Sequence, residues 1–437
     1  MNQPGPVAIQ PAVSEQNIRT RGRVLVVLGG VVLAVLPAPF YVSVALRMDR
    51  FEPEPFRLLA WTFLWGAAGA TFVALVLNTA GQAIVGDEFG AHIGELYGNS
   101  VSAPIVEEVA KGAVLYVLYR RFRAHFNSVV DGVVYAAMVG LGFATTENIL
   151  YYAQSATEGG VPLVATFFMR GVMSPFTHPI FTAMTGIGLA LALASDRAAV
   201  KRLAPALGLL LAILLHSAWN TSATVEEGAG FFFVFSLVFV VAVAVLAAVG
   251  TAQKREGKVV AHYLQPEMAS GLLTREELFA LSSGRERMRA RRAAKKQGGR
   301  KAMRRMKTLQ IAASELAFRR YRDQAGHPGR GPETPEDQQL AKLREAAGDI
   351  PAGTLAPPIP RGSEKLPPPP PVMPAGWYPE PPRGVEAVTG PSAKAPPAPP
   401  PPRPVMPGLP PAAWYPDPWR ESNLRWWDGG AWTGWTS

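Results

Sequence analysis

The feature that most constrains the fold is a series of long apolar runs that fill the chain up to about residue 250. A helix that crosses a bilayer needs roughly 20 predominantly apolar residues, and a helix satisfies its own backbone polar groups in lipid. Runs of this length lie near 24–46, 58–79, 100–119, 129–152, 203–221 and 229–250. The sequence therefore predicts an all-α, polytopic transmembrane helical bundle.

The stretch 163–195 is longer than one span and is interrupted by Arg170, Pro175 and Pro179. We interpret it as a short interfacial or broken helix followed by one span, with Arg170 as an interfacial anchor, which brings the total to about seven spans. The first run has the basic flank of a signal peptide, but it continues too far for a cleaved signal, so we interpret it as a transmembrane helix.

The composition changes at about Thr251, where the chain becomes charged and then rich in proline. The sequence contains no cysteine, which excludes disulfides, a thiol nucleophile and a thiolate metal site. We divide the chain into a polar N-terminal segment (1–22), a transmembrane core (23–251), a cytoplasmic helical and basic segment (252–326), a disordered proline-rich linker (327–412) and a tryptophan-rich module (413–437).

The charges of the connecting loops predict the orientation of the later spans. Basic loops at 120–125, 197–202 and 254–258 are expected in the cytoplasm, whereas the charged residues of 153–162 and 222–228 are all acidic and these loops are expected outside. The alternation is consistent across four spans and places the tail in the cytoplasm. Arginines flank the first span on both sides, so the side of the N-terminus stays open.

The sequence EEVAK places Glu107, Glu108 and Lys111 inside an apolar run. A charged side chain at that depth costs at least ~2.5–3.5 kcal/mol, so an acid within a span indicates a functional site. On a helix Lys111 lies one turn from both acids and can pair with a carboxylate. Adjacent helical residues point about 100° apart, so we expect one acid to face a polar site and the other to pair with the lysine. A purely structural ion pair is the alternative.

Other polar residues fall at the same depth when the predicted orientation is applied. Glu147, His178, His216 and Asn220 all lie near the outer ends of their spans, and the two acids of EEVAK lie about two turns down from the outer end of theirs. Each group would be costly against lipid, so the sequence predicts a shared, water-accessible pocket inside the bundle.

Carboxylates, imidazoles and an amide around one pocket suit the activation of a water molecule. A carboxylate can act as general base, histidines can bind a divalent metal, and an amide can donate to an oxyanion. The sequence has no HExxH motif. An aspartyl dyad lacks a partner for Asp131, which is interpreted as a helix-start residue. A serine nucleophile at Ser102, Ser174 or Ser217 stays open but is not favoured.

These motifs carry a resemblance to a known family. EEVAK, the run DGVVYAAMVGLGFATTENILYY, HPIFT at His178 and HSAWN at His216 resemble the PrsW family of intramembrane metalloproteases, which belongs with the CAAX prenyl proteases and bacteriocin-immunity proteins. The resemblance covers about residues 24–250 and implies proteolysis of a membrane-embedded substrate, in the type member an anti-sigma factor.

The resemblance also implies residue roles. Glu107 would be the base that activates water, Glu108 and Lys111 its support, and Glu147 and Asn220 part of the remaining catalytic shell. His178, His216 and Glu147 would hold a divalent metal, with zinc favoured. This chain has a glutamate, Glu147, where the CAAX enzymes have a histidine, so the site can bind zinc or work without metal.

The sequence of the tail indicates a binding role rather than a catalytic one. Residues 259–282 have helical spacing, with Thr274 as a cap. The basic run 285–307 is expected near anionic lipid, with nucleic acid or an acidic partner as the less favoured alternatives. The tryptophan-rich end resembles a short domain of unknown function with the pattern WYPDP…RWWDG..WT. Its Asp428-Gly429 pair predicts a β-hairpin. We expect this module to dock to a cytoplasmic protein partner.

The sequence therefore predicts an intramembrane protease of the plasma membrane. Its partners would be a membrane-embedded protein substrate and the lipid bilayer. Two alternatives remain, a transporter or proton pathway that uses the same polar cluster and a non-catalytic scaffold whose working part is the tail.

Overall fold

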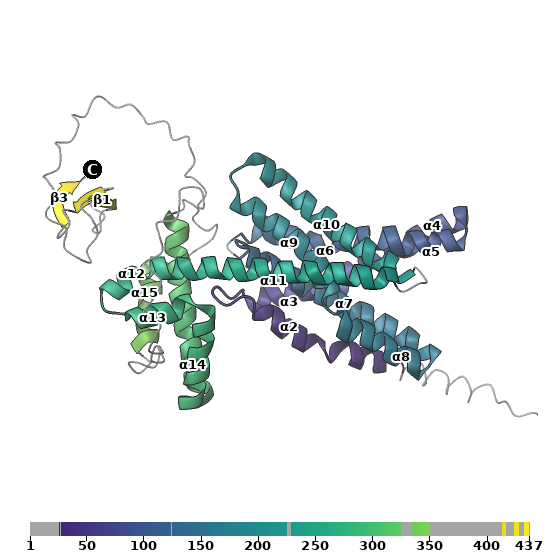
Figure 1. Ribbon diagram of the computed structural model, residues 1–437, viewed down its shortest axis with the longest axis horizontal. Helices are drawn as coiled ribbons and strands as arrows, with labels where there is room; N and C mark the ends of the chain where they lie inside the picture. Colours follow the sequence, from purple (N-terminus) through teal and green to yellow (C-terminus); the bar gives the residue numbers. More distant parts are fainter. Residues whose placement is uncertain are drawn as a thin grey trace, which may run out of the picture. The chain divides into compact units, whose positions relative to one another are not determined.

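The computed structural model describes residues 26, 28–123, 125–224, 229–324 and 334–348, and the three strands at 413–416, 424–427 and 432–436. By spatial contacts the chain divides into two compact units, residues 1–381 and 382–437. In the first unit all regular elements of the described residues are helices (Figure 1). The second unit contains the strands.

Six helices of the described part are long and apolar enough to cross a membrane. These are Leu28–Leu46, Phe56–Phe89, Val129–Glu158, Gly160–Ala194, Ala198–Ser222 and Gly230–Tyr263. The first contains α2 (Ala38–Leu46), the second consists of α3 (Phe56–Leu64), the π-helix η1 (Trp65–Ala70) and α4 (Thr71–Phe89), and the third is α7 (Val129–Glu158). The fourth consists of α8 (Gly160–Phe167), the π-helix η3 (Phe168–Met173) and α9 (Thr177–Ala194), and the last two lie within α10 (Ala198–Thr224) and α11 (Ala229–Tyr263). This confirms a multi-pass membrane protein.

The predicted span at 100–119 corresponds to α6, Ala103–Arg121, which follows α5, Ala91–Tyr97, and the π-helix η2, Gly98–Ser102. Its charged side chains keep α6 out of the group of six, and the count of seven spans stays a prediction. The predicted break in 163–195 is present, because the chain turns at Ser174–Phe176 between η3 and α9.

Helix α7 is the centre of the bundle, and 83% of its apolar window is buried. It begins with a capping box in which Ser128 and Asp131 satisfy each other's backbone N–H groups, as the helix-start interpretation of Asp131 requires. Small residues let its neighbours approach closely: a Cβ at Gly140 would lie 2.7 Å from the nitrogen of Pro179 on α9. This contact fixes the start of α9 against α7.

The helices after α11 form a second hydrophobic core at one end of the bundle. They are α12 (Gln265–Ala269), α13 (Arg275–Ser282), α14 (Gly284–Gln324) and α15 (Glu336–Gly348). Helix α13 begins with a capping box between Thr274 and Glu277, as predicted. Helix α14 is a hairpin of two helices, because Gly298 and Gly299 have non-helical backbone angles.

The first membrane helix ends at this same core. Phe51 follows it after a short loop and is buried among α11, α13 and α14, and the guanidinium of Arg287 lies 4.7 Å from its ring centroid. The segment Leu28–Leu46 therefore runs toward the tail, so its N-terminal end lies at the opposite end of the bundle. This gives the direction of the first span relative to the tail, whereas the side of the membrane on which the N-terminus lies stays a prediction.

The strands β1 (Ala413–Pro416), β2 (Leu424–Trp427) and β3 (Trp432–Thr436) form an antiparallel sheet in the order β1-β2-β3. Trp414 pairs with Trp426 in the first ladder, and Trp427 pairs with Trp432 in the second. The docking role of this module stays a prediction, and the proline-rich linker lies outside the described residues.

Candidate functional site

The EEVAK segment lies on α6, and its three charged side chains are buried inside the bundle. The ammonium of Lys111 is completely buried and donates to Glu108 at 2.9 Å and to Glu107 at 3.3 Å. It also lies 3.9 Å from the centroid of the Phe143 ring on α7. The lysine therefore contacts both carboxylates, whereas the sequence predicted a pair with one of them.

Glu108 is the more fully bound of the two acids. Besides Lys111, it accepts a hydrogen bond from the hydroxyl of Thr182 at 2.9 Å and one from Nδ1 of His216 at 3.0 Å. Its side chain has no solvent exposure. Among the described residues, Glu107 has only the longer contact to Lys111 and a 3.8 Å approach to Nε2 of His216. Glu107 is therefore the carboxylate that is free to act on another molecule.

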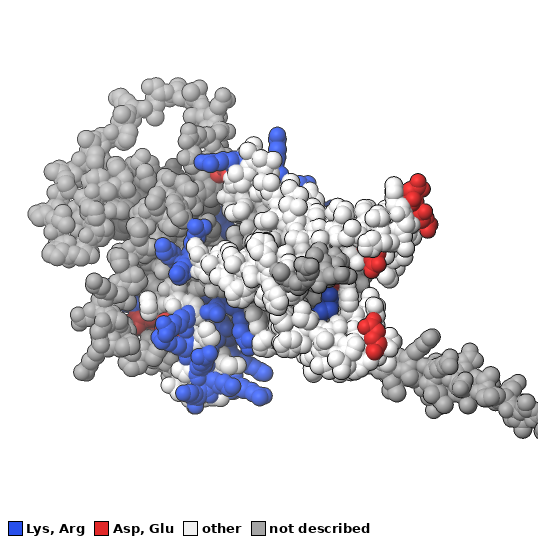
Figure 2. Space-filling view, turned by 45° about the vertical axis from the view of Figure 1, so that its right-hand side comes forward, with Lys and Arg blue, Asp and Glu red and all other residues white. Residues whose placement is uncertain are grey.

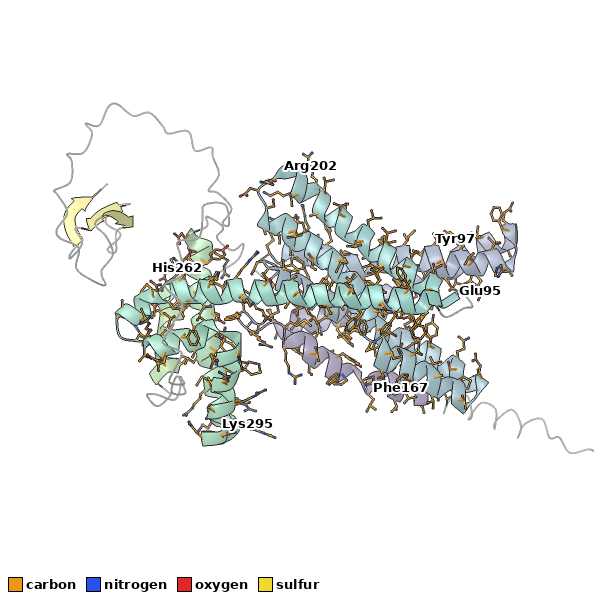
Figure 3. The ribbon with its side chains drawn as sticks, viewed as in Figure 1. Glu95, Tyr97, Phe167, Arg202, His262 and Lys295 are labelled. Atoms are coloured by element: carbon orange, nitrogen blue, oxygen red, sulfur yellow. The ribbon has the colours of Figure 1, made fainter. Side chains whose placement is uncertain are left out.

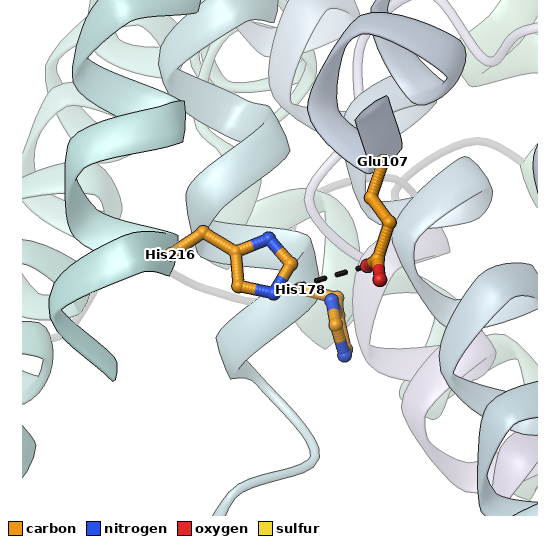
Figure 4. A group of neighbouring side chains, drawn as sticks. All are labelled: Glu107, His178 and His216. Carbon is orange, nitrogen blue, oxygen red and sulfur yellow. Dashed lines mark ion pairs between the residues drawn. The ribbon is translucent and has the colours of Figure 1, made fainter. Parts of the chain in front are cut away.

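The two histidines come from α9 and α10 and meet at Glu107. Their rings pack edge to face, with centroids 5.1 Å apart. Ligand atoms of Glu107, His178 and His216 lie within 4.8 Å of one another, and all three residues are buried. Figure 4 shows the carboxylate and both imidazoles pointing toward one another.

Hydrogen bonds define the tautomer of each imidazole. Nδ1 of His216 donates to the carboxylate of Glu108, which leaves the lone pair of Nε2 facing Glu107. Nδ1 of His178 lies 3.0 Å from the ammonium of Lys111, which can only donate, so Nδ1 accepts. Nε2 of His178 then donates to Glu147 at 2.8 Å. Each imidazole is thus oriented by a carboxylate behind it.

Arg170 belongs to this network. Its guanidinium binds Glu147 at 2.5 Å and the side-chain oxygen of Asn148 at 2.8 Å, and it lies 3.9 Å from the centroid of the Tyr151 ring. The interpretation of Arg170 as an interfacial anchor is wrong, because the π-helix η3 directs the side chain to α7. Sequence reasoning missed it because nothing local relates residue 170 to Glu147.

A pocket lies beside the network. Its lining includes Glu147, Arg170, His178, Trp219 and Asn220. The amide nitrogen of Asn220 donates one hydrogen bond to the carbonyl of Asn99 at 3.0 Å. Asn220 therefore lies at the pocket but outside the Glu107, His178 and His216 group.

The predicted metal ligands can be compared with this arrangement. The sequence assigned Glu147, His178 and His216, whereas the geometry places Glu107 with the two histidines and puts Glu147 behind His178. Carboxylate oxygen and imidazole nitrogen are zinc ligands, and a carboxylate behind each imidazole is the usual support of a metal-binding histidine. The donor set therefore fits a divalent metal, provided that the hydrogen bond from the ammonium of Lys111 to Nδ1 of His178 is broken.

The serines weighed as nucleophiles have other partners. Ser102 donates to the side chain of Asn78, Ser174 to the carbonyl of Met169 and Ser217 to the carbonyl of Ser100. None of these bonds, within the described residues, reaches a histidine. The geometry does not favour a serine nucleophile.

A multi-pass helical bundle that buries carboxylates and imidazoles beside a pocket has the groups that hydrolysis inside a membrane requires. Comparison with known proteins shows a similarity to one family. Residues 54–248 match the model of the PrsW family intramembrane metalloprotease. These 195 of 437 residues are the membrane part of the chain, and over them it is similar to the PrsW family of intramembrane proteases.

Three relatives show the extent of the similarity. Protease PrsW of Bacillus subtilis is 28% identical over 188 residues, which are 43% of this chain and 78% of the relative. Protease PrsW of Geobacillus kaustophilus is 30% identical over 35% of this chain and 61% of the relative. Protease PrsW of Clostridioides difficile is 26% identical over 44% and 79%, respectively. No solved structure matches the chain significantly.

Proposed function

We propose that the chain hydrolyses a peptide bond of a membrane-embedded protein and that Glu107 takes the proton of the attacking water. The observation that supports this most is the convergence of one incompletely bound carboxylate and two oriented imidazoles from three helices, with one of these imidazoles, that of His178, also lining a pocket. A general base must lie within hydrogen-bond reach of the water that it activates. Glu107 meets this requirement better than Glu108, whose two oxygens are already occupied.

The other groups support Glu107. Lys111 faces it and can stabilise its charge, while Glu108 and Glu147 hold the two imidazoles in place. Asn220 has a second amide hydrogen that its bond to Asn99 does not use. We propose that this amide donates to the oxyanion that forms when water attacks the substrate carbonyl.

A divalent metal, with zinc favoured, would be held by Glu107, His178 and His216. A bound metal would supply Lewis-acid polarisation of the carbonyl and lower the pKa of water. Because a carboxylate has two oxygens, Glu107 can present one to the metal and keep the other for the proton.

The structure gives the alternatives less support. A proton pathway needs polar groups that continue through the bundle, but α6 buries Val114, Leu115 and Leu118 below Lys111, each at most 2% exposed. A scaffold would leave Glu107 dispensable. Its buried charge is costly in lipid, so a scaffold gives no reason to keep it.

The test is cleavage in membranes of a panel of single-span, anti-sigma-type proteins from the same cell. Wild type is compared with Glu107→Gln, which keeps size and hydrogen bonding but removes the base. Glu95→Gln, an exposed acid on α5, is the matched control. We expect a fragment with wild type and with the control and none with Glu107→Gln. Unchanged cleavage by Glu107→Gln would refute the assignment.

A further inference from the structure

The α14 hairpin carries a dense set of exposed cations that the protease site does not use. They include Arg285, Arg289, Arg292, Lys295, Lys296, Arg300, Lys301, Arg304 and Lys307. In residues 285–307 the one acid is Glu286, which pairs with Arg289 at 2.6 Å. Figure 2 shows the basic side chains gathered at this end, whereas acidic side chains lie at the opposite end of the bundle.

The hairpin holds these cations in a fixed array. Its two halves pack through buried apolar side chains, which include Ala290, Ala294, Met306 and Leu309. The buried Arg287 donates to the hydroxyl of Ser314 at 2.8 Å and ties the first half to the second. Because the inner faces are filled in this way, the cations lie on the outer faces.

The base of the hairpin lies at the border between lipid and water. The first charged residue of α11 is Lys254, and Gly257, three residues or about 4.5 Å further along the helix, packs against Ser282. Arg50, four residues after the end of α2, packs against Gly284. Headgroups occupy roughly 5–8 Å on each side of the hydrocarbon. The hairpin therefore starts at headgroup depth.

The hairpin also extends along the membrane surface. Helix α14 crosses the direction of α11, and its tip at Lys295 lies to one side of α11, at the edge of the bundle (Figure 3). The exposed cations thus lie where lipid headgroups surround the protein.

We propose that the outer surface of the α14 hairpin docks onto the anionic phospholipid headgroups of the adjacent leaflet, which the loop charges predict to be the cytoplasmic one. The array is complementary in charge to such headgroups, and each cation near the surface adds about fivefold to binding. Nucleic acid is the less favoured partner, because residues 285–307 contain no aromatic side chain on which a base could stack.

The test measures the distance of the hairpin tip from the headgroups in the full chain. Since the chain has no cysteine, Gln297→Cys gives a single labelling site at the exposed tip. The labelled protein is reconstituted into vesicles of phosphatidylcholine alone or with added phosphatidylglycerol. Quenching by a headgroup-attached quencher then reports docking.

Two charge variants in the Gln297→Cys background separate the surface from net charge. K295Q/K296Q/K301Q removes three hairpin cations, and the matched control R275Q/K342Q/R344Q removes three exposed cations from α13 and α15. We expect quenching that requires phosphatidylglycerol and decreases with salt. The hairpin variant should weaken docking on the order of 100-fold, and the control far less.

Three results would overturn the proposal. Quenching could be equal with and without phosphatidylglycerol, or the control variant could lose as much docking as the hairpin variant. Duplex DNA or RNA could also draw the labelled tip away from vesicles that contain phosphatidylglycerol, which would make nucleic acid the preferred partner.

Discussion

Among the residues of the site, Lys111 is the one whose removal should lower the free energy of unfolding the most. Its buried ammonium contacts the carboxylates of Glu107 at 3.3 Å and Glu108 at 2.9 Å. Met is close to Lys in size and keeps the packing on Phe143, so Lys111→Met removes the charge with little change of shape. The variant leaves two buried carboxylates without their shared cation.

The geometry gives the expected magnitude. At an effective dielectric constant of about 20, the attraction is about 5 kcal/mol at 3.3 Å and about 6 kcal/mol at 2.9 Å, before desolvation is counted. Removing one partner of a buried pair costs about 3–5 kcal/mol, because the other charge stays buried. We expect Lys111→Met to lower the free energy of unfolding by that amount.

The assay is reversible unfolding of the purified chain in mixed micelles. Lys254→Met removes an exposed cation of α11 and should cost less than about 0.5 kcal/mol. The double variant with Glu108→Gln removes one of the two charges left behind and should recover about 1–3 kcal/mol as coupling energy. A loss below about 1 kcal/mol for Lys111→Met, with no coupling to Glu108, would refute the reasoning.

Three further predictions concern the site and its surroundings. Gly140→Ala brings a Cβ within 2.7 Å of the Pro179 nitrogen. It should lower the free energy of unfolding by about 1–3 kcal/mol, measured by unfolding in micelles, and slow cleavage on the order of 10–100-fold, measured by cleavage kinetics. His216→Ala should lower the zinc bound by the purified chain, measured against the exposed His92→Ala, and equal zinc content would exclude His216 as a ligand. Burial and neighbouring acids raise the pKa of Asp49 from 3.8 to about 8. The folded chain therefore holds a proton that the unfolded chain releases, stability should fall as the pH rises from about 4 to about 8, and Asp49→Asn should flatten that fall in thermal unfolding.

The membrane helices could be predicted from the sequence because lipid requires long apolar runs, and these are local features. The cap at Thr274 and the break before α9 are local too, and the structure has both. The direction of the first span could not be predicted, because it depends on Phe51 packing into the core of the tail. That contact joins segments more than 200 residues apart in the sequence.

The similar depth of Glu107, Glu147, His178 and His216 in their spans predicts that these residues meet, since each polar group avoids lipid. Depth alone does not predict which carboxylate faces which imidazole. That depends on helix rotation, which the packing of α6, α7, α9 and α10 sets. The partner of Arg170 could not be predicted for the same reason, because Glu147 lies 23 residues away on another helix.

The central claim is that Glu107 drives hydrolysis of a peptide bond inside the membrane. The most direct measurement is cleavage of a purified single-span substrate by the reconstituted protein in heavy-oxygen water, followed by mass spectrometry of the new C-terminus. The account predicts that wild type places one heavy oxygen in the new carboxylate and that Glu107→Gln yields no fragment. A labelled fragment produced equally by Glu107→Gln would contradict it.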